Sequence, residues 1–156
     1  MDPERRDARI RRLGADDIPT MRAMNAMMGE AFDQRDVHGA APPDDGYLRA
    51  LLGDDRFIAL AATCDGDVVG GLVAYELRKY EQARSEVYIY DLAVDADHRR
   101  RGIATALIDA LRPIARACGA WVVYVQADPD DGPAMALYAK LGTREDVCHF
   151  DIGVDS

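Results

Sequence analysis

The stretch Arg99-Arg100-Arg101-Gly102-Ile103-Ala104 follows a strand-like apolar run, residues 87–94, and opens a long amphipathic helical pattern. The first backbone N–H groups of a helix have no intrahelical acceptor, and the helix dipole adds partial positive charge at the same end. Gly102 lets the chain approach an anion closely, and His98 and the arginines add cationic charge. The strand, turn and helix start therefore predict a site for a phosphate-bearing ligand.

The glycine spacing of this turn excludes the two common phosphate-binding motifs. A Walker loop needs Gly-Lys-Ser or Gly-Lys-Thr, which is absent from the chain. The dinucleotide fingerprint needs three glycines, and this turn has only one of them. The ligand is therefore expected to be a phosphate carrier of another kind.

The residues on both sides of the turn predict an α/β fold with a mixed, mostly antiparallel central sheet flanked by helices. Asp65-Gly66-Asp67 joins two apolar runs and predicts a β-hairpin. Near-continuous apolar residues predict that residues 86–94 and 120–126 are central strands. Strands are expected over residues 8–13, 57–64, 68–77, 86–94, 120–126 and 147–152, and helices over residues 18–32, 44–52, 101–118 and 133–141.

Short polar residues and glycines mark the ends of the expected helices. Methionines recur at helical spacing in the first of these helices, which predicts ordinary core packing. The expected end signals are Asp16 and Asp17 before the first helix, Asp44 before the second, Gly119 after the third, and Asp131 and Gly142 on either side of the fourth.

The length of 156 residues fits one domain, residues 1–156, in which residues 1–7 are expected to be frayed. No run approaches the roughly 20 apolar residues that a membrane helix needs, and no apolar segment of a secretory signal follows the N-terminus. The three cysteines are widely spaced and have no Cys-x-x-Cys pair or nearby histidine ligands. A cytoplasmic protein with reduced thiols, core cysteines and no metal is expected.

The formal net charge is −9, which argues against nucleic acid as the main partner and favours a cationic one. Simple solubility of an acidic domain is the alternative explanation of the same total. Residues 128–156 contain seven carboxylates but only one lysine and one arginine, whereas basic residues gather in residues 5–12 and 98–101. A basic pocket and an acidic region suggest two ligands of opposite charge.

Three segments together resemble the signature regions of the GNAT superfamily of N-acetyltransferases. They are Asp91-Leu92-Ala93-Val94, the turn at residues 99–104, and Ala136-Leu137-Tyr138-Ala139-Lys140-Leu141-Gly142. The resemblance implies the GNAT fold over one domain and acetyl-CoA as cofactor, with coenzyme A as product. It also implies that the turn binds the pyrophosphate of acetyl-CoA.

A more specific resemblance covers most of the chain from Asp44 onward. The segments Arg84-Ser85-Glu86-Val87-Tyr88-Ile89-Tyr90-Asp91-Leu92-Ala93-Val94 and Tyr124-Val125-Gln126-Ala127-Asp128 are similar to aminoglycoside 3-N-acetyltransferases of the gentamicin, sisomicin and fortimicin type. Such an enzyme would acetylate the 3-amino group of the deoxystreptamine ring by direct transfer and confer antibiotic resistance. A polycationic small molecule is then the expected partner, with no nucleic acid or membrane, and a homodimer is common in such enzymes.

The resemblance assigns the cofactor to residues around the turn and along the preceding strand. Backbone N–H groups from Arg100 to Thr105 would hold the pyrophosphate, with Arg99 and Arg100 as charge-assisted donors. Leu92, Ala93 and Val94 would lie beside the pantetheine on a strand that separates from residues 120–126. The full expected set is Leu92, Ala93, Val94, Arg99, Arg100, Arg101, Gly102, Ile103, Ala104 and Thr105.

Asp91 is the strongest candidate for receiving the acceptor amine, because a carboxylate inside an apolar strand needs a cation or a hydrogen-bond network. A structural pair with an arginine is the alternative role for Asp91. Asp91 could accept the amine proton directly or through a water, and Glu86 is the alternative base. Tyr138 stands where the superfamily often keeps a general acid for the coenzyme A thiolate, although a thiolate leaves with little help.

The acceptor cleft is expected to combine Tyr90 and Asp91 with carboxylates of the acidic region. Each exposed ion pair contributes below about 1 kcal/mol, but a polycation meets several together. Helix capping is an equal alternative for Asp131. Two other functions remain open, an acetyltransferase of polyamines or other small amines and a non-catalytic acyl-CoA-binding domain. The expected acceptor residues are Tyr90, Asp91, Asp128, Asp131, Glu145 and Asp151.

Overall fold

The computed structural model describes residues 7–34 and 41–155. Residues 1–126 and 127–156 form two compact units, which are described separately below. Of the frayed segment expected at residues 1–7, only Asp7 lies within the described residues. Organisation of the chain as a single domain stays a prediction.

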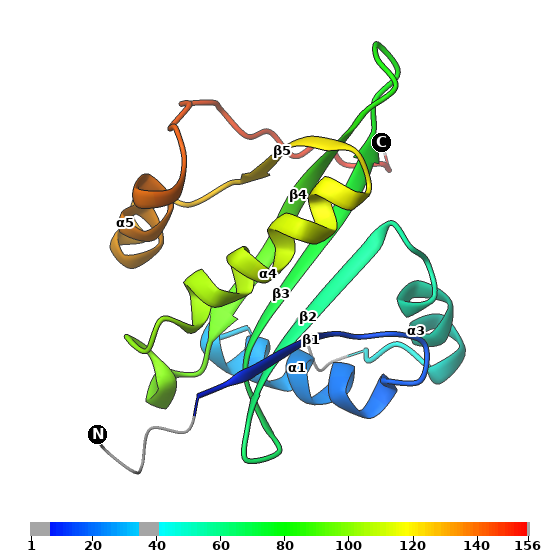
Figure 1. Ribbon diagram of the computed structural model, residues 1–156, viewed down its shortest axis with the longest axis vertical. Coiled ribbons are helices and arrows are strands. Elements are labelled where there is room, and N and C mark those ends of the chain that lie inside the picture. The colour runs from blue at the N-terminus through cyan, green and yellow to red at the C-terminus, as the bar shows by residue number, and fades with distance from the viewer. Residues whose placement is uncertain (1–6, 35–40, 156) are drawn as a thin grey trace. The chain divides into compact units, whose positions relative to one another are not determined.

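The first unit contains a five-stranded sheet in the order β1-β2-β3-β4-β5 (Figure 1). Neighbouring strands are antiparallel except β4 and β5, which are parallel. The predicted α/β class with a mixed, mostly antiparallel sheet is therefore confirmed. The strands are β1 (Arg9–Arg12), β2 (Phe57–Cys64), β3 (Asp67–Arg78), β4 (Ser85–Val94) and β5 (Ala120–Val125).

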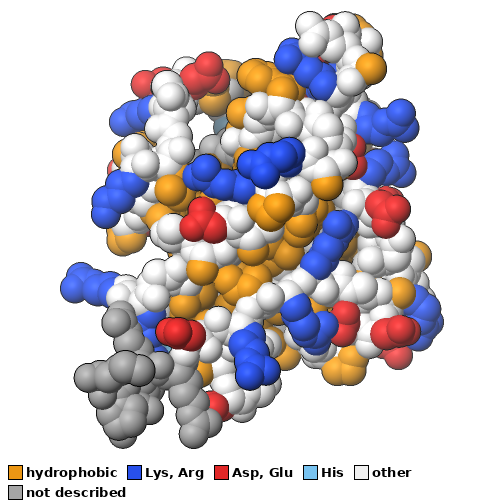
Figure 2. Space-filling model, viewed as in Figure 1, with side chains coloured by type: hydrophobic (Ala, Val, Ile, Leu, Met, Phe, Trp, Pro, Cys, Tyr) orange, Lys and Arg blue, Asp and Glu red, His pale blue; other side chains and the backbone are white. Residues whose placement is uncertain are grey.

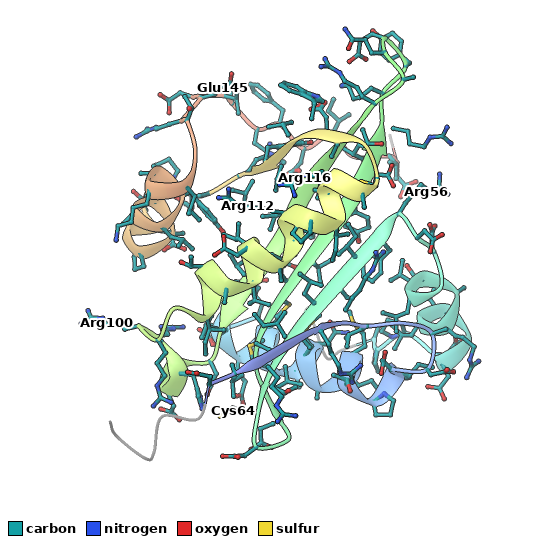
Figure 3. All side chains as sticks on the ribbon, in the orientation of Figure 1. Arg56, Cys64, Arg100, Arg112, Arg116 and Glu145 are labelled. Carbon is teal, nitrogen blue, oxygen red and sulfur yellow. The ribbon has the colours of Figure 1, made fainter. Side chains whose placement is uncertain are left out.

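Helices cover both faces of this sheet. α1 (Ile18–Ala31) and α3 (Asp45–Leu52) pack on one face, and α4 (Ile103–Ala117) packs on the other (Figure 1). The expected Met-rich helix is α1, whose Met24 and Met28 are almost completely buried. α4 buries one apolar side against the sheet, including Leu107 and Leu111. Lys and Arg side chains lie over its outer side in Figure 2, and Figure 3 identifies Arg112 and Arg116 there.

Local turn chemistry explains several of these boundaries. Asp44 caps α3, because its Oδ1 accepts a hydrogen bond from Tyr47 N at 2.8 Å. Asp65 and Gly66 both have positive φ in the hairpin turn between β2 and β3, and Gly119, which follows the C-cap Cys118 of α4, has a φ of +81°. Asp17 differs from the prediction. Its carboxylate accepts from Gly14 N at 2.7 Å instead of capping α1.

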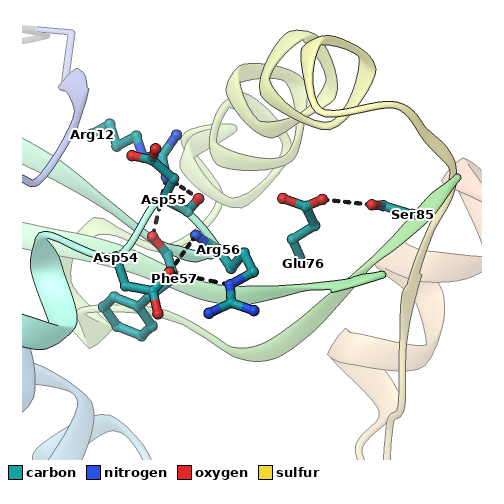
Figure 4. A network of polar contacts seen from close by, with 7 residues as sticks. All are labelled: Arg12, Asp54, Asp55, Arg56, Phe57, Glu76 and Ser85. Carbon is teal, nitrogen blue, oxygen red and sulfur yellow. Dashed lines mark hydrogen bonds and ion pairs between the residues drawn. The ribbon is translucent and has the colours of Figure 1, made fainter. Parts of the chain in front are cut away.

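Polar contacts hold the end of the sheet where β2 and β4 begin (Figure 4). Arg12 donates to the carbonyl oxygens of Asp55 and Phe57 at 2.9 and 3.1 Å. The buried Ser85 hydroxyl donates to Glu76 Oε2 over 2.5 Å, which joins β4 to β3 through side chains. These contacts join β1 to the start of β2, and β3 to the start of β4, at this end of the sheet.

The second unit contains α5 (Gly132–Leu141), whose first turn is capped by Asp131 Oδ1 accepting from Ala134 N at 3.1 Å. The strand predicted for residues 147–152 is wrong, because no strand forms over these described residues. β5 is consequently an edge strand of the described sheet and not the central strand predicted. Alternating apolar residues are compatible with a strand, but a strand forms only where backbone partners are available.

Candidate functional site

The turn after β4 adopts the left-handed backbone conformation twice in three residues. φ is +63° at Arg100 and +76° at Gly102, which is the N-cap of α4. A β-carbon built at Gly102 would meet no atom within 4 Å, so the glycine is needed for its backbone angle and not for space. A left-handed segment before a helix points successive N–H groups toward one side, as anion-binding turns do.

The start of α4 presents backbone N–H groups that lie outside the helical hydrogen-bond ladder. The first helical bond runs from Ala106 N to Gly102 O at 3.0 Å, so the N–H groups of Ile103, Ala104 and Thr105 precede the ladder. α4 has no side-chain cap at this end. These N–H groups, together with the helix dipole, can bind a phosphate, as expected from the sequence.

The cationic side chains around the turn are held in different ways. His98 Nδ1 lies 2.9 Å from Asp95 Oδ2, and Arg99 Nε donates to the Val94 carbonyl over 3.4 Å. Arg100 and Arg101 are exposed, and Arg100 extends outward at the end of the turn (Figure 3). Arg99 is therefore tied by this bond to the end of β4, whereas the Arg100 side chain reaches into solvent.

β4 continues beyond the point where β5 stops pairing with it. The paired positions run from Ser85 with Ala120 to Ile89 with Val125, and Leu92, Ala93 and Val94 pair only with β3. The backbone of this second half of β4 is therefore open on its β5 side. β5 ends at Val125, its last paired position, so β4 extends past it and leaves polar backbone groups that can bind an extended ligand.

A β-bulge reorients β4 at the centre of the site. Val73 pairs with Asp91 while Ala74 pairs with Ile89, so Tyr90 is the extra residue in β4. The Tyr90 ring lies 5.9 Å from the Tyr75 ring. Bulges bend a strand and re-aim its side chains, and this one brings Tyr90 and Asp91 beside aromatic rings of β3 and β4.

Four aromatic residues occupy one register row across the sheet. Phe57 pairs with Tyr75, Tyr75 pairs with Tyr88, and Tyr88 pairs with Tyr124, so the row crosses β2, β3, β4 and β5. We call these four residues the aromatic row. The Phe57 and Tyr75 rings are 5.4 Å apart, and the Tyr88 and Tyr124 rings stack at 4.8 Å. The exposed Tyr90 ring lies 6.0 Å from that of Tyr88.

The phenols of this face stay protonated at neutral pH. Burial is the main cause that raises the pKa of Tyr75, Tyr88 and Tyr124. The Asp91 carboxylate also raises the pKa of Tyr75 and Tyr88, which indicates that it faces the same aromatic surface. The site therefore combines one carboxylate with neutral aromatic faces.

Glu86, the alternative candidate for the general base, forms an ion pair with Lys79. Its carboxylate lies 2.7 Å from Lys79 Nζ, and its side chain is only 17% exposed. It lies on the same strand as Asp91, but its charge is offset by the lysine. This ion pair occupies the Glu86 carboxylate, which disfavours Glu86 as a general base.

The second unit holds the remaining predicted residues. Asp131 caps α5, Asp128 Oδ1 accepts from Asp130 N at 2.9 Å, and Asp151 Oδ1 lies 2.8 Å from His149 Nε2. Glu145 is exposed. Burial raises the pKa of the Tyr138 phenol, and the Asp131 carboxylate raises it further. A protonated Tyr138 is the form that a general acid requires.

The expectation that all three cysteines lie in the core is wrong, because Cys64 and Cys118 are partly buried and Cys148 is exposed. Burial raises the pKa of the Cys118 thiol, which disfavours a reactive thiolate. Residues 7–34 and 41–155 contain no cluster of His, Cys, Asp or Glu side chains suited to a metal ion. Among the described helices, none has the length and apolar character needed to cross a membrane.

Tyr75, Tyr88 and Tyr124 were missed as site residues in the sequence. Tyr88 and Tyr90 occupy alternate positions of a strand, which was a usable signal that they share a face. The alignment of Tyr75 and Tyr124 with them depends on strand register, and the sequence carries no local signal for that register.

The chain matches a model of one protein family. Residues 23–143 match the model described as the acetyltransferase (GNAT) family. A mycothiol acetyltransferase of Clavibacter michiganensis subsp. michiganensis is 29% identical over 131 residues. That match covers 84% of this chain but only 40% of the relative, so the chain spans about two fifths of that protein's length.

Two solved structures are much more similar over their whole length. An aminoglycoside acetyltransferase from an uncultured soil metagenomic sample is 51% identical with a TM-score of 0.94, covering 96% of this chain and 100% of that one. A second such enzyme from a soil metagenomic sample, in complex with sisomicin, is 31% identical with a TM-score of 0.87. This second match covers 95% of this chain and 97% of that chain.

Proposed function

Because the chain belongs to the acetyltransferase (GNAT) family, we propose that it is an aminoglycoside 3-N-acetyltransferase. It transfers an acetyl group from acetyl-CoA to the 3-amino group of a deoxystreptamine aminoglycoside and so confers resistance. The observation that carries the proposal is the β4 bulge, which places Asp91 directly after Tyr90 and just beyond the last pair of β4 with β5. Similarity to two soil aminoglycoside acetyltransferases, one of them with sisomicin bound, supports the same acceptor class.

Family membership confirms the predicted class of enzyme, an acetyl-CoA-dependent N-acetyltransferase, and the predicted cofactor. The residues present fit that cofactor. The N–H groups of Ile103, Ala104 and Thr105 suit its pyrophosphate, and Arg100 and Arg101 add positive charge in solvent. The open edge of β4 from Leu92 to Val94 suits its extended pantetheine arm. Bound acetyl-CoA supplies the thioester that the amine attacks.

Asp91 is the proposed base. An aminoglycoside amine arrives as an ammonium ion, and it must lose a proton before it can attack a carbonyl carbon. The Asp91 carboxylate attracts the ammonium and accepts the proton, directly or through one water. Backbone N–H groups of Leu92, Ala93 or Val94 stabilise the developing oxyanion, where one well-placed donor contributes about 3 kcal/mol.

Tyr138 is the proposed general acid for the departing thiolate. Its raised pKa keeps the phenol protonated and able to donate. A thiol with a pKa near 8.5 leaves with little help, so the contribution of Tyr138 to the rate is expected to be small. Glu86, bound to Lys79, is the weaker candidate for a base.

Tyr90 and Asp91 are proposed to bind the acceptor, and the carboxylates of the second unit remain acceptor residues proposed from the sequence. Asp128, Glu145 and Asp151 carry charge that an aminoglycoside can use, although Asp151 is also paired with His149. Asp131 caps α5 through one carboxylate oxygen and keeps its negative charge. A homodimer remains an expectation from the family resemblance, and a cytoplasmic location remains an expectation from the cysteine pattern.

The test is acetylation of gentamicin and sisomicin with acetyl-CoA, followed by mass spectrometry and location of the modified nitrogen by NMR. The proposal expects one added acetyl group on the 3-amino nitrogen, and little product from Asp91→Asn. Acetylation of another nitrogen contradicts the regiochemistry. Turnover of spermidine without turnover of either drug favours the polyamine alternative, and coenzyme A binding without any turnover favours a non-catalytic domain.

A further inference from the structure

We propose that the aromatic row and Tyr90 form a platform that receives a saturated ring of the acceptor and selects cyclic amino sugars over linear polyamines. This inference rests on the proposed function, because the platform adjoins Asp91. It concerns the recognition of the acceptor, whereas the proposed function concerns the reaction. The rings that an acceptor can reach are those of Tyr75, Tyr88, Tyr90 and Tyr124, and the buried Phe57 supports Tyr75 from the core.

The rings form one continuous surface and are not isolated aromatic residues. Tyr90 joins Tyr75 to Tyr88, with ring centroids 5.9 and 6.0 Å away. Phe57 lies 5.4 Å from Tyr75, and Tyr124 lies 4.8 Å from Tyr88. These separations are in the range in which aromatic pairs attract each other. Since four of the rings share one register row of a paired sheet, the backbone fixes their spacing before any ligand arrives. A preformed surface loses little conformational entropy on binding.

Burial changes steadily along this surface. Phe57 is 4% exposed in the core, Tyr75 and Tyr88 are partly buried, and Tyr90 is 61% exposed. A sheet face that served packing alone could use aliphatic residues throughout, and it would not bring a tyrosine out through a bulge. The Tyr88 hydroxyl donates to Gln126 Oε1 at 3.1 Å, so a polar partner orients this ring from its outer edge.

The charge of the platform suits an amine that carries several ammonium groups. Neutral aromatic faces attract ammonium ions through their quadrupole. The raised pKa values of Tyr75, Tyr88 and Tyr124, caused mainly by burial, keep the phenols neutral. The Asp91 carboxylate lies on the same face of the sheet, because it pairs with Val73, two residues before Tyr75 in β3. The rings therefore attract the non-reacting ammonium groups without competing with Asp91 for the reacting one.

The shape of the platform distinguishes acceptor classes. An amino sugar is a rigid saturated ring, and its C–H face can cover one or two aromatic rings at once. A linear polyamine has many rotatable bonds that must be ordered to lie on the same surface. This loss of conformational entropy makes its binding free energy less favourable. Loss of a platform ring should therefore weaken binding of cyclic acceptors much more than binding of linear ones.

The experiment measures binding of sisomicin and of spermidine to the coenzyme A complex by calorimetry, for the natural chain and for Tyr90→Ala. We expect Tyr90→Ala to raise the Kd of sisomicin by roughly 5- to 30-fold and the Kd of spermidine by less than about twofold. Tyr90→Phe, which keeps the ring, should restore most of the sisomicin affinity. Tyr80→Ala is the matched control, because Tyr80 is 99% exposed on the connection between β3 and β4.

Each outcome decides the inference. Equal losses for both amines, unchanged sisomicin binding in Tyr90→Ala, or failure of the natural chain to bind sisomicin overturns the platform. If Tyr90→Phe does not restore the affinity for sisomicin, the hydroxyl and not the ring is responsible for binding, and the platform is also overturned. Sisomicin that binds with the expected dependence on Tyr90 but is not acetylated refutes the proposed function and leaves the platform supported.

Discussion

Substitution of Gly102 by valine tests the assignment of the turn as the cofactor site. Gly102 has a φ of +76°, and a β-carbon there meets no atom within 4 Å. Valine therefore acts through the backbone and not by filling the turn. A non-glycine residue in the left-handed region costs about 1–2 kcal/mol, and a β-branched side chain is especially unfavourable there.

The backbone can relieve this cost by changing φ, which turns the N–H groups of Ile103 and Ala104 away from a bound phosphate. We expect the Kd of coenzyme A to rise by roughly 10-fold or more, since 1.4 kcal/mol corresponds to a factor of 10. Isothermal titration calorimetry measures the Kd, and chemical denaturation measures the free energy of unfolding.

Gly66→Val is the matched control. Gly66 lies in the hairpin turn between β2 and β3 and has a φ of +89°. A β-carbon built there also meets no atom within 4 Å. It should lower the free energy of unfolding by a similar amount and leave the Kd of coenzyme A unchanged. Equal Kd values for Gly102→Val and Gly66→Val would refute the assignment of the turn.

Four further substitutions test the site and the fold. Asp91→Asn should lower kcat by about 10²- to 10⁴-fold in the aminoglycoside assay, with an unchanged Kd for coenzyme A, and normal turnover would remove Asp91 from the mechanism. Tyr138→Phe should lower kcat less than about tenfold, because a thiolate leaves readily, and a larger loss would make proton donation important. Gly71→Ala should lower the free energy of unfolding by about 1–3 kcal/mol, because its β-carbon would lie 2.5 Å from Met24 Sδ, and an unchanged denaturation midpoint would contradict this packing. Hydrogen bonds from Gly14 and Arg11 lower the pKa of Asp17, so its stabilising contribution is present above its ordinary value of 3.8 and is lost as pH falls through the folded-state pKa. The stability difference between the natural chain and Asp17→Asn should therefore shrink in acid, and a constant difference from pH 2 to pH 7 would contradict it.

Features that depend on a few adjacent residues could be predicted from the sequence. Asp44 and Asp131 cap helices, Gly119 follows α4 with a positive φ, and Asp65-Gly66 forms the hairpin turn. These outcomes follow from local hydrogen bonds and backbone angles. Asp17 was an exception, because Gly14 and Arg11 compete for its carboxylate.

Features that depend on pairing between distant segments could not be predicted in this way. Residues 147–152 alternate like a strand, yet no strand forms over them in the described chain. Alternation is a property of one segment, whereas a strand needs a second segment in register. The same reason explains why the partner of Glu86 was missed. Lys79 reaches it across the end of the hairpin between β3 and β4.

The sequence by itself determined the strand, glycine-containing turn and helix start that form the proposed cofactor site, because all three lie within residues 87–105. It also singled out Asp91, since a carboxylate in an apolar strand requires a partner. Tertiary structure alone decided what surrounds Asp91. The bulge at Tyr90 and the alignment of Phe57, Tyr75, Tyr88 and Tyr124 arise from register between strands. That register is set by the packing of whole sheet faces against helices, which no short stretch of sequence specifies.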